Sequence, residues 1–181
     1  MLQPINNIKY FLILAVFLNS ENAVGQAIVK IEDDRREGEI GFFTNIGAKL
    51  DASRGNRDRD FYSLKFRFDN NSEAVESFLI LQQSERKSNS KVIDDSTFMH
   101  GRYIFVGEKN VNWELFAQYS ENPFRNYKKR SVFGGGIRYE ISSSARFGGG
   151  LMSEDETDLS SLSKTTERFG FYLHNSFSVA E

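Results

Sequence analysis

Two histidines, His100 and His174, are the side chains in this sequence best suited to acid–base chemistry near neutral pH. A histidine beside a serine and an aspartate or asparagine can activate a nucleophile, and hydrolases use this arrangement. Neither histidine is accompanied by a G-x-S-x-G motif or a similar nucleophile motif. We therefore predict no catalytic residues and no enzymatic activity, and a hydrolase using either histidine is the least favoured of three functions that the sequence allows.

Two glycine triplets, Gly134–Gly136 and Gly148–Gly150, occur in the related segments FGGGIRYE and FGGGLMSE. A glycine-rich loop that binds phosphate must open a helix, and no helical pattern follows either triplet. We interpret the glycines as parts of two paired strands, where they ease curvature and leave room for Arg138 and Arg146. The sequence thus predicts no cofactor site.

An acidic segment contains Glu154, Asp155, Glu156 and Asp158. Its spacing does not match the calcium loop of an EF-hand, and a run of charges is usually a solvated surface. The chain has no cysteine, which excludes disulfides, thiol catalysis and cysteine-bound metal. We predict a solvated loop here and no metal site.

The composition favours one domain made of long strands. A chain of 181 residues can form one domain with its own core. Its net charge is −2, with both signs interspersed, and nothing in this pattern suggests the basic face that a nucleic-acid-binding protein needs. Aromatic residues make up 14% of the chain and only two prolines are present, and this suits uninterrupted strands because proline removes a donor from the ladder.

The N-terminus has the pattern of a secretory signal peptide. The apolar run Tyr10–Leu18 follows a lysine, and Ala23 and Gly25 are the small residues that precede a cleavage site. The run is shorter than the roughly 20 residues that a membrane-spanning helix needs. We predict a signal peptide over residues 1–25, export from the cytoplasm, and a mature domain over residues 26–181.

The mature chain alternates apolar and polar residues with a period of two, which is the pattern of strands. Leu115, Ala117 and Tyr119, for example, share one face, and Glu114 lies on the other. The third predicted strand alternates least clearly, so the sequence does not indicate which of its residues share the apolar face. The approximate limits of the eight predicted strands are 39–51, 60–69, 74–84, 97–106, 111–120, 130–141, 145–152 and 165–179.

The predicted connections alternate between short turns and long polar loops. Short turns at one end and long loops at the other are typical of bacterial outer-membrane barrels, and strands of about ten residues can cross a bilayer when tilted. We therefore predict an all-β fold, an antiparallel up-and-down transmembrane β-barrel of about eight strands. The predicted long loops are Ser53–Arg59, Glu85–Ser96, Glu121–Lys129 and Glu154–Lys164.

Composition indicates which face of the predicted barrel points outward. The charged face would need to pair its charges inside a narrow barrel, because isolated buried charges are costly. It carries Lys49, Lys65, Arg67, Arg102, Glu114, Arg138, Glu140, Arg146 and Arg168. The other face has too many large aromatics to enclose a cavity: Phe42, Tyr62, Phe66, Phe68, Tyr103, Phe105, Trp113, Tyr119, Phe133, Tyr139, Phe147, Phe169, Phe171 and Phe177.

We predict that the aromatic face contacts lipid. The alternative is a soluble periplasmic barrel, similar to a lipocalin, that encloses the aromatic face and binds an apolar ligand. The two differ in whether the protein stays in solution without detergent.

Several segments, taken in order, resemble those of a known family. They are Ile28–Asp33, Ser53–Asp58, His100–Tyr103, Phe116–Tyr119, Asn122–Arg125 and Gly134–Tyr139. The family is that of the YdiY-like, salt-induced outer membrane proteins of Gram-negative bacteria, a domain of unknown function. The resemblance implies an outer-membrane β-barrel of unassigned activity and transfers no functional residues. Family members tend to be longer, so the chain either closes at eight strands or lacks C-terminal strands present in its relatives.

The strand pattern predicts a bacterial outer-membrane protein with a structural or envelope-related role, and the family resemblance implies a role in salt stress. It is not a wide pore, because side chains just fill the interior of an eight-stranded barrel. We expect a monomer that contacts outer-membrane lipid and lipopolysaccharide and depends on the barrel-assembly machinery, with no nucleic-acid partner.

Overall fold

The computed structural model describes residues 39–142 and 145–175. The predicted signal peptide, the segment after it and the end of the eighth predicted strand, with Phe177, lie outside the described residues. The chain separates into two units, Met1–Glu37 and Gly38–Glu181, and the described residues all belong to the second.

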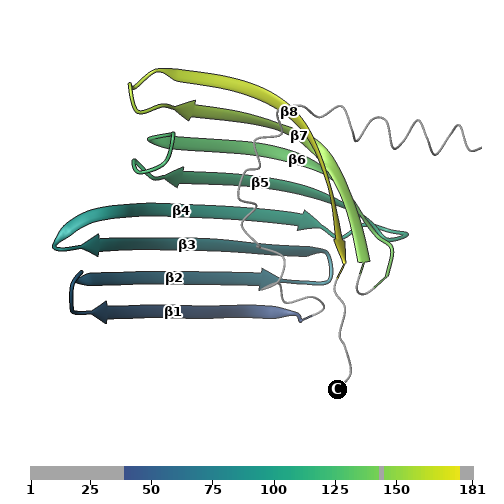
Figure 1. The fold of residues 1–181 in the computed structure, drawn as a ribbon. Coiled ribbons are helices and arrows are strands. Elements are labelled where there is room, and N and C mark those ends of the chain that lie inside the picture. Colours follow the sequence, from purple (N-terminus) through teal and green to yellow (C-terminus); the bar gives the residue numbers. More distant parts are fainter. Residues whose placement is uncertain (1–38, 143–144, 176–181) are drawn as a thin grey trace, which may run out of the picture. The chain divides into compact units, whose positions relative to one another are not determined.

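The described part of the chain consists of strands and their connections (Figure 1). The strands are β1 (Gly41–Ser53), β2 (Arg59–Asn71), β3 (Val75–Ser88), β4 (Lys91–Phe105), β5 (Val111–Glu121), β6 (Lys129–Glu140), β7 (Ala145–Thr157) and β8 (Ser163–Asn175).

All eight strands form one antiparallel sheet in which each strand pairs with its neighbour in sequence. The predicted all-β, up-and-down fold of eight strands is confirmed. The sheet is curved, and the bend is clearest in β7 and β8 (Figure 1). Among the described residues no ladder joins β1 to β8, and no helix is long and apolar enough to span a membrane.

The predicted loop over Glu85–Ser96 is wrong. β3 continues to Ser88 and β4 begins at Lys91, so the two-residue turn Asn89–Ser90 joins them. Both turn residues have positive φ angles, 49° and 64°, as a type I′ hairpin requires. Apart from Val92 and Ile93 the segment is polar, so its composition is that of a loop although its backbone is extended.

The predicted loop over Glu154–Lys164 is also too long, since β7 runs to Thr157 and β8 begins at Ser163. Loop length therefore does not distinguish the two ends of the sheet. The connections at one end are 54–58, 89–90, 122–128 and 158–162, and those at the other end are 72–74, 106–110 and 141–144.

Replacing Ser90 by glycine should stabilise the β3–β4 hairpin by about 1 kcal/mol, because a left-handed backbone costs an L-residue roughly 1–2 kcal/mol that glycine avoids. Denaturant unfolding of the native and variant proteins would measure the gain. Asn89→Gly is the matched control, and its gain should be smaller because asparagine tolerates this conformation better. A loss of stability in Ser90→Gly would contradict the assigned turn.

Candidate functional site

One face of the sheet, which carries Trp113, Leu151 and Leu173, is apolar and exposed. It is called the outward face. Trp113, Leu151 and Leu173 are 58%, 69% and 71% exposed. Continuous apolar surface of this extent is rare on soluble monomers and marks contact with another apolar phase or partner. Exposed large apolar residues that alternate with inward positions also include Phe42, Ile46, Leu50, Leu64, Leu79, Met99, Tyr103, Phe105, Leu115, Phe133, Ile137, Tyr139, Phe147, Phe169 and Phe171. This is the face that the sequence predicted to be aromatic.

These outward residues form a belt whose limit is aligned between neighbouring strands. On β5 the belt covers the outward residues of Trp113–Tyr119, and Glu121 lies beyond it. On β6 it covers those of Phe133–Tyr139, and Ser131 lies beyond it. Tyr119 pairs with Ser131 across the two strands, which keeps the boundary in register to within one outward position. The apolar belt is thus about seven residues high, or roughly 20 Å along a strand.

Aromatic side chains follow one edge of the apolar belt. Phe105 pairs with Trp113, and Tyr139 pairs with Phe147, close to the β4–β5 and β6–β7 connections. The rings of Tyr103 and Phe105 meet edge to face with centroids 4.8 Å apart. Tyrosine and tryptophan at the rim of an apolar band are typical of residues that lie at a membrane–water interface.

The opposite face of the sheet, called the inward face, carries the charges. The nine charged residues predicted to share a face all lie on it by strand register. Arg138 is fully buried, and Arg67 and Arg146 are 3% and 4% exposed. Lys49 and Arg168 belong to the edge strands β1 and β8 and are exposed. The prediction that the polar residues form an inward network is confirmed for the central strands by the contacts that follow.

Arg67 is paired within its own strand. Its Nε and Nη2 atoms donate hydrogen bonds of 2.7–3.0 Å to the carboxylate of Asp69. Its guanidinium carbon also lies 4.4 Å from the centre of the Phe78 ring. A bidentate ion pair that stacks on an aromatic ring meets the conditions under which buried charges are tolerated.

Glu114 contacts side chains from three other strands. Arg102 of β4 and Arg138 of β6 approach its Oε2 atom to 3.6 and 3.7 Å. The Tyr172 hydroxyl of β8 donates to the same carboxylate at 3.2 Å and accepts a hydrogen bond of 2.9 Å from Arg138 Nε. These four residues are called the Glu114 cluster. The sequence placed Arg102, Glu114 and Arg138 on the polar face but gave no sign that Tyr172 joins these charges.

Glycines leave space beside this cluster. Glu114 pairs with Gly136, Gly136 with Gly150, and Gly150 with Gly170, so three adjacent strands present no side chain in this row. The prediction that the two glycine triplets lie on paired strands of one hairpin is confirmed. The contribution of Gly170 was missed, because only the strand register aligns it with the triplets.

Gly148 lies between Arg138 and Tyr172 on neighbouring strands. A Cβ atom at this position would lie 2.4 Å from the Tyr172 ring, so the absence of a side chain makes room for the ring. The predicted room beside Arg138 is therefore present, and the tyrosine uses it. Arg146 instead faces Glu140, with 3.8 Å between Nε and Oε2.

A second inward group is aromatic and surrounds His100. The imidazole stacks with Phe78, Phe98 and Phe116 at centroid distances of 5.7, 6.3 and 6.2 Å, and it is 2% exposed. Phe78 also settles the inward face of β3, which the sequence left open. His174 lies inward on β8, opposite Arg146 in the β7–β8 ladder. His100 therefore has the surroundings of a packed interior side chain.

The prediction of a solvated acidic loop is wrong for most of its residues. Glu154 is 3% exposed on the inward face of β7, 3.5 Å from Arg130 and 3.2 Å from Arg168. Glu156 is 2.7 Å from Arg130, and only Asp158 belongs to the turn. Charges that alternate between two faces of a strand read as one charge run in sequence. Within the described ranges no three metal-binding side chains gather.

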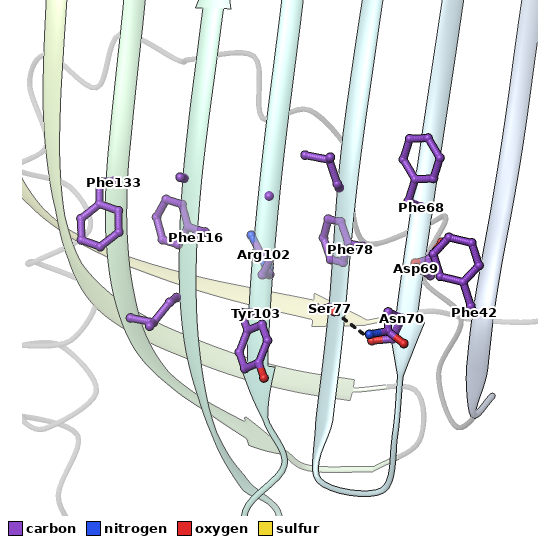
Figure 2. A pocket seen from close by; sticks show the side chains of 14 residues that line it. Phe42, Phe68, Asp69, Asn70, Ser77, Phe78, Arg102, Tyr103, Phe116 and Phe133 are labelled. Carbon is purple, nitrogen blue, oxygen red and sulfur yellow. Dashed lines mark hydrogen bonds between the residues drawn. The ribbon is translucent and has the colours of Figure 1, made fainter.

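The outward face is hollowed over Gly101 and Ala117, which pair with each other on β4 and β5. The depression has a volume of about 450 Å³ and an apolar lining. Figure 2 shows Phe68, Tyr103 and Phe133 among the side chains around it. The small residues at its centre and the large ones around it belong to the same apolar belt.

An up-and-down antiparallel sheet with an exposed apolar belt outside and buried charges inside has its faces reversed relative to an ordinary soluble sheet. The fold and its two faces thus define the class: an all-β protein of β-barrel type with an inverted polarity. The chain belongs to the family described as "Protein of unknown function, DUF481", whose model matches residues 45–147. This confirms the family that the sequence resembles. No curated protein and no solved structure matches the chain.

Proposed function

We propose that this chain is an outer-membrane β-barrel of a Gram-negative bacterium, in which β1 and β8 pair to close the sheet and the apolar belt contacts lipid. One observation carries the proposal: the large apolar side chains are exposed while Arg138, Glu114 and Arg67 are buried. In water this arrangement would cost free energy on both faces. In a bilayer the same arrangement is the stable one.

The dimensions of the sheet support this proposal. The strands have 11–15 residues, and a tilted strand needs about 9–11 to cross a bilayer. The apolar belt measures roughly 20 Å along a strand, which is the same order as the ~25 Å apolar band of outer-membrane barrels, although the tilt of the strands reduces its height across the bilayer. Closure would also pair the two edges that the sheet otherwise exposes.

The interior supports a structural or envelope-stress role rather than a wide pore, since eight strands enclose a space that side chains fill. The charged inward face also argues against the soluble alternative, because a lipocalin-like cavity for an apolar ligand would be lined by the apolar residues. As partners we propose outer-membrane lipid, lipopolysaccharide at the outer leaflet and the barrel-assembly machinery. We propose that the protein functions as a monomer.

The proposal is tested by expressing the full chain, isolating outer membranes and comparing boiled with unboiled samples on an SDS gel. Retention in the membrane with a heat-dependent change of migration is expected, because a closed barrel resists SDS until heated. Release into the periplasmic fraction with no change of migration would contradict the proposal.

Closure itself is tested by engineered disulfides, which the absence of native cysteine makes simple to read. Cysteine at Ile46, an outward position of β1, would be combined in turn with cysteine at each outward position of β8 from Thr165 to Leu173, because closure of a barrel staggers the register between its first and last strands. A disulfide requires Cα atoms about 4.4–6.8 Å apart, so only strands that pair will form one within a single chain. Thr44→Cys combined with Met99→Cys of β4 is the negative control. Disulfides that form only between chains would show that β1 pairs with a second copy instead.

A further inference from the structure

Among the described residues, the Glu114 cluster joins strands that are not neighbours in the sheet. Arg67 and Asp69 belong to one strand, whereas Tyr172 of β8 reaches Glu114 of β5 across both intervening strands. The two residues are 58 positions apart in sequence. The cluster therefore bridges the space in front of the inward face.

Backbone pairing of the sheet does not need this bridge. The ladders β5–β6, β6–β7 and β7–β8 extend well beyond the row of Glu114 on both sides, for example from Lys129↔Thr157 to Glu140↔Arg146. The inward glycines beneath the bridge contribute no side chains of their own to fill the space. The Tyr172 ring lies against Gly148, and its hydroxyl reaches Glu114 at 3.2 Å. Removing the tyrosine ring would thus empty space without removing a strand contact.

The surroundings of this space are polar and charged. The Arg138 side chain, which contacts both Glu114 and the tyrosine hydroxyl, is fully buried, and the Glu114 side chain is 6% exposed. The Glu140–Arg146 pair lies two residues further along the β6–β7 ladder than Arg138, on the same face. A path opened here would be lined by hydrogen-bonding groups and would therefore hold water and ions rather than an apolar ligand.

We propose that the Glu114 cluster closes a narrow ion path through the interior, and we call the cluster the latch in this role. Tyr172 blocks the path in the native state. When its hydrogen bonds to Glu114 and Arg138 break, the path opens to small inorganic ions. This proposal rests on the closed barrel proposed above. The tyrosine ring blocks the path sterically, and its two hydrogen-bonding partners hold the ring in place. Glu114 also balances two arginines, so it sets the charge that a passing ion meets.

The test is single-channel recording in planar lipid bilayers with the full chain in potassium chloride. The native protein should show brief or no openings, and Tyr172→Ala should show long-lived ones. Glu114→Gln should open similarly and shift the reversal potential toward anions, because Arg102 and Arg138 lose their counter-charge. Tyr127→Ala is the matched control: this tyrosine lies in the connection 122–128, outside both the apolar belt and the Glu114 cluster, and its removal should leave the currents unchanged.

The possible results distinguish failure of the proposed latch from failure of the proposed barrel. Every variant is first assayed for the heat-dependent migration of the native protein. Variants that keep this migration but give native currents would overturn the latch and leave the barrel standing. If the native protein itself shows no heat-dependent migration and no membrane retention, the proposed barrel fails and the latch fails with it.

Discussion

Replacing Leu115 by arginine should prevent stable insertion of the protein into lipid bilayers. Leu115 lies within the apolar belt on β5, between Trp113 and Tyr119, and its side chain is outward and exposed. An arginine that faces lipid near the bilayer midplane costs about 2–4 kcal/mol, a large part of the stability of a small domain. On the surface of a soluble protein the same substitution would be close to neutral. The variant therefore distinguishes an apolar face that contacts lipid from one that belongs to a soluble protein.

The measurement is guanidinium unfolding of protein refolded into lipid vesicles, followed by the fluorescence of Trp113, the single tryptophan of the chain. The matched control is Ser131→Arg, an outward substitution on β6 that lies beyond the apolar belt. Near the interface an arginine costs only about 0–1 kcal/mol. Equal losses for the two variants, or no loss for Leu115→Arg, would contradict a lipid-facing belt.

Most of the fold could be predicted because the two faces of the central strands differ in kind. On β5 the outward Leu115 alternates with the inward Glu114, and this contrast identifies both the strand and its faces. On β3 the inward residues include Phe78 and Ile80 while outward Leu79 is also apolar, so alternation gave no answer there. The structure assigned that strand through its pairing with neighbours.

The ends of β3 and β4 could not be predicted for the opposite reason. Glu85, Arg86 and Lys87 are charged on both faces of the strand, and composition alone cannot distinguish such a strand from a loop. What holds them extended is the hairpin turn at Asn89–Ser90 and the pairing with β4. A turn without glycine in the left-handed positions carries a weak sequence signal.

The candidate site was predictable in its composition and not in its contacts. The inward position of Glu114, Arg102 and Arg138 follows from alternation within single strands. The hydrogen bond between Tyr172 and Glu114 depends on how the two strands between them, β6 and β7, are aligned in three successive ladders. A single sequence does not contain that alignment, because each ladder could slip by two residues and keep the same faces.

Replacing Gly150 by alanine should disrupt the pairing of β6 with β7, and with it the Glu114 cluster. A Cβ atom at Gly150 would lie 2.3 Å from the carbonyl oxygen of Gly135, far inside van der Waals contact. The opposing atom is backbone, so no side chain can move aside and the strands must separate. Overpacking of this kind typically costs 1–3 kcal/mol, and about 3 kcal/mol is expected here because the backbone must move.

The neighbouring glycine supplies the matched control. Gly149 faces outward, and the nearest atom to a Cβ there is the carbonyl oxygen of Gly170 at 3.6 Å, an ordinary contact. Gly149→Ala should therefore change the free energy of unfolding by less than about 1 kcal/mol. Denaturant unfolding in detergent micelles would compare the two variants, and amide hydrogen exchange would show whether the β6–β7 ladder opens. Equal stability of the two variants would contradict the close approach of Gly136 and Gly150. The glycines would then serve curvature alone, and the room in which Tyr172 reaches Glu114 would have to come from another source.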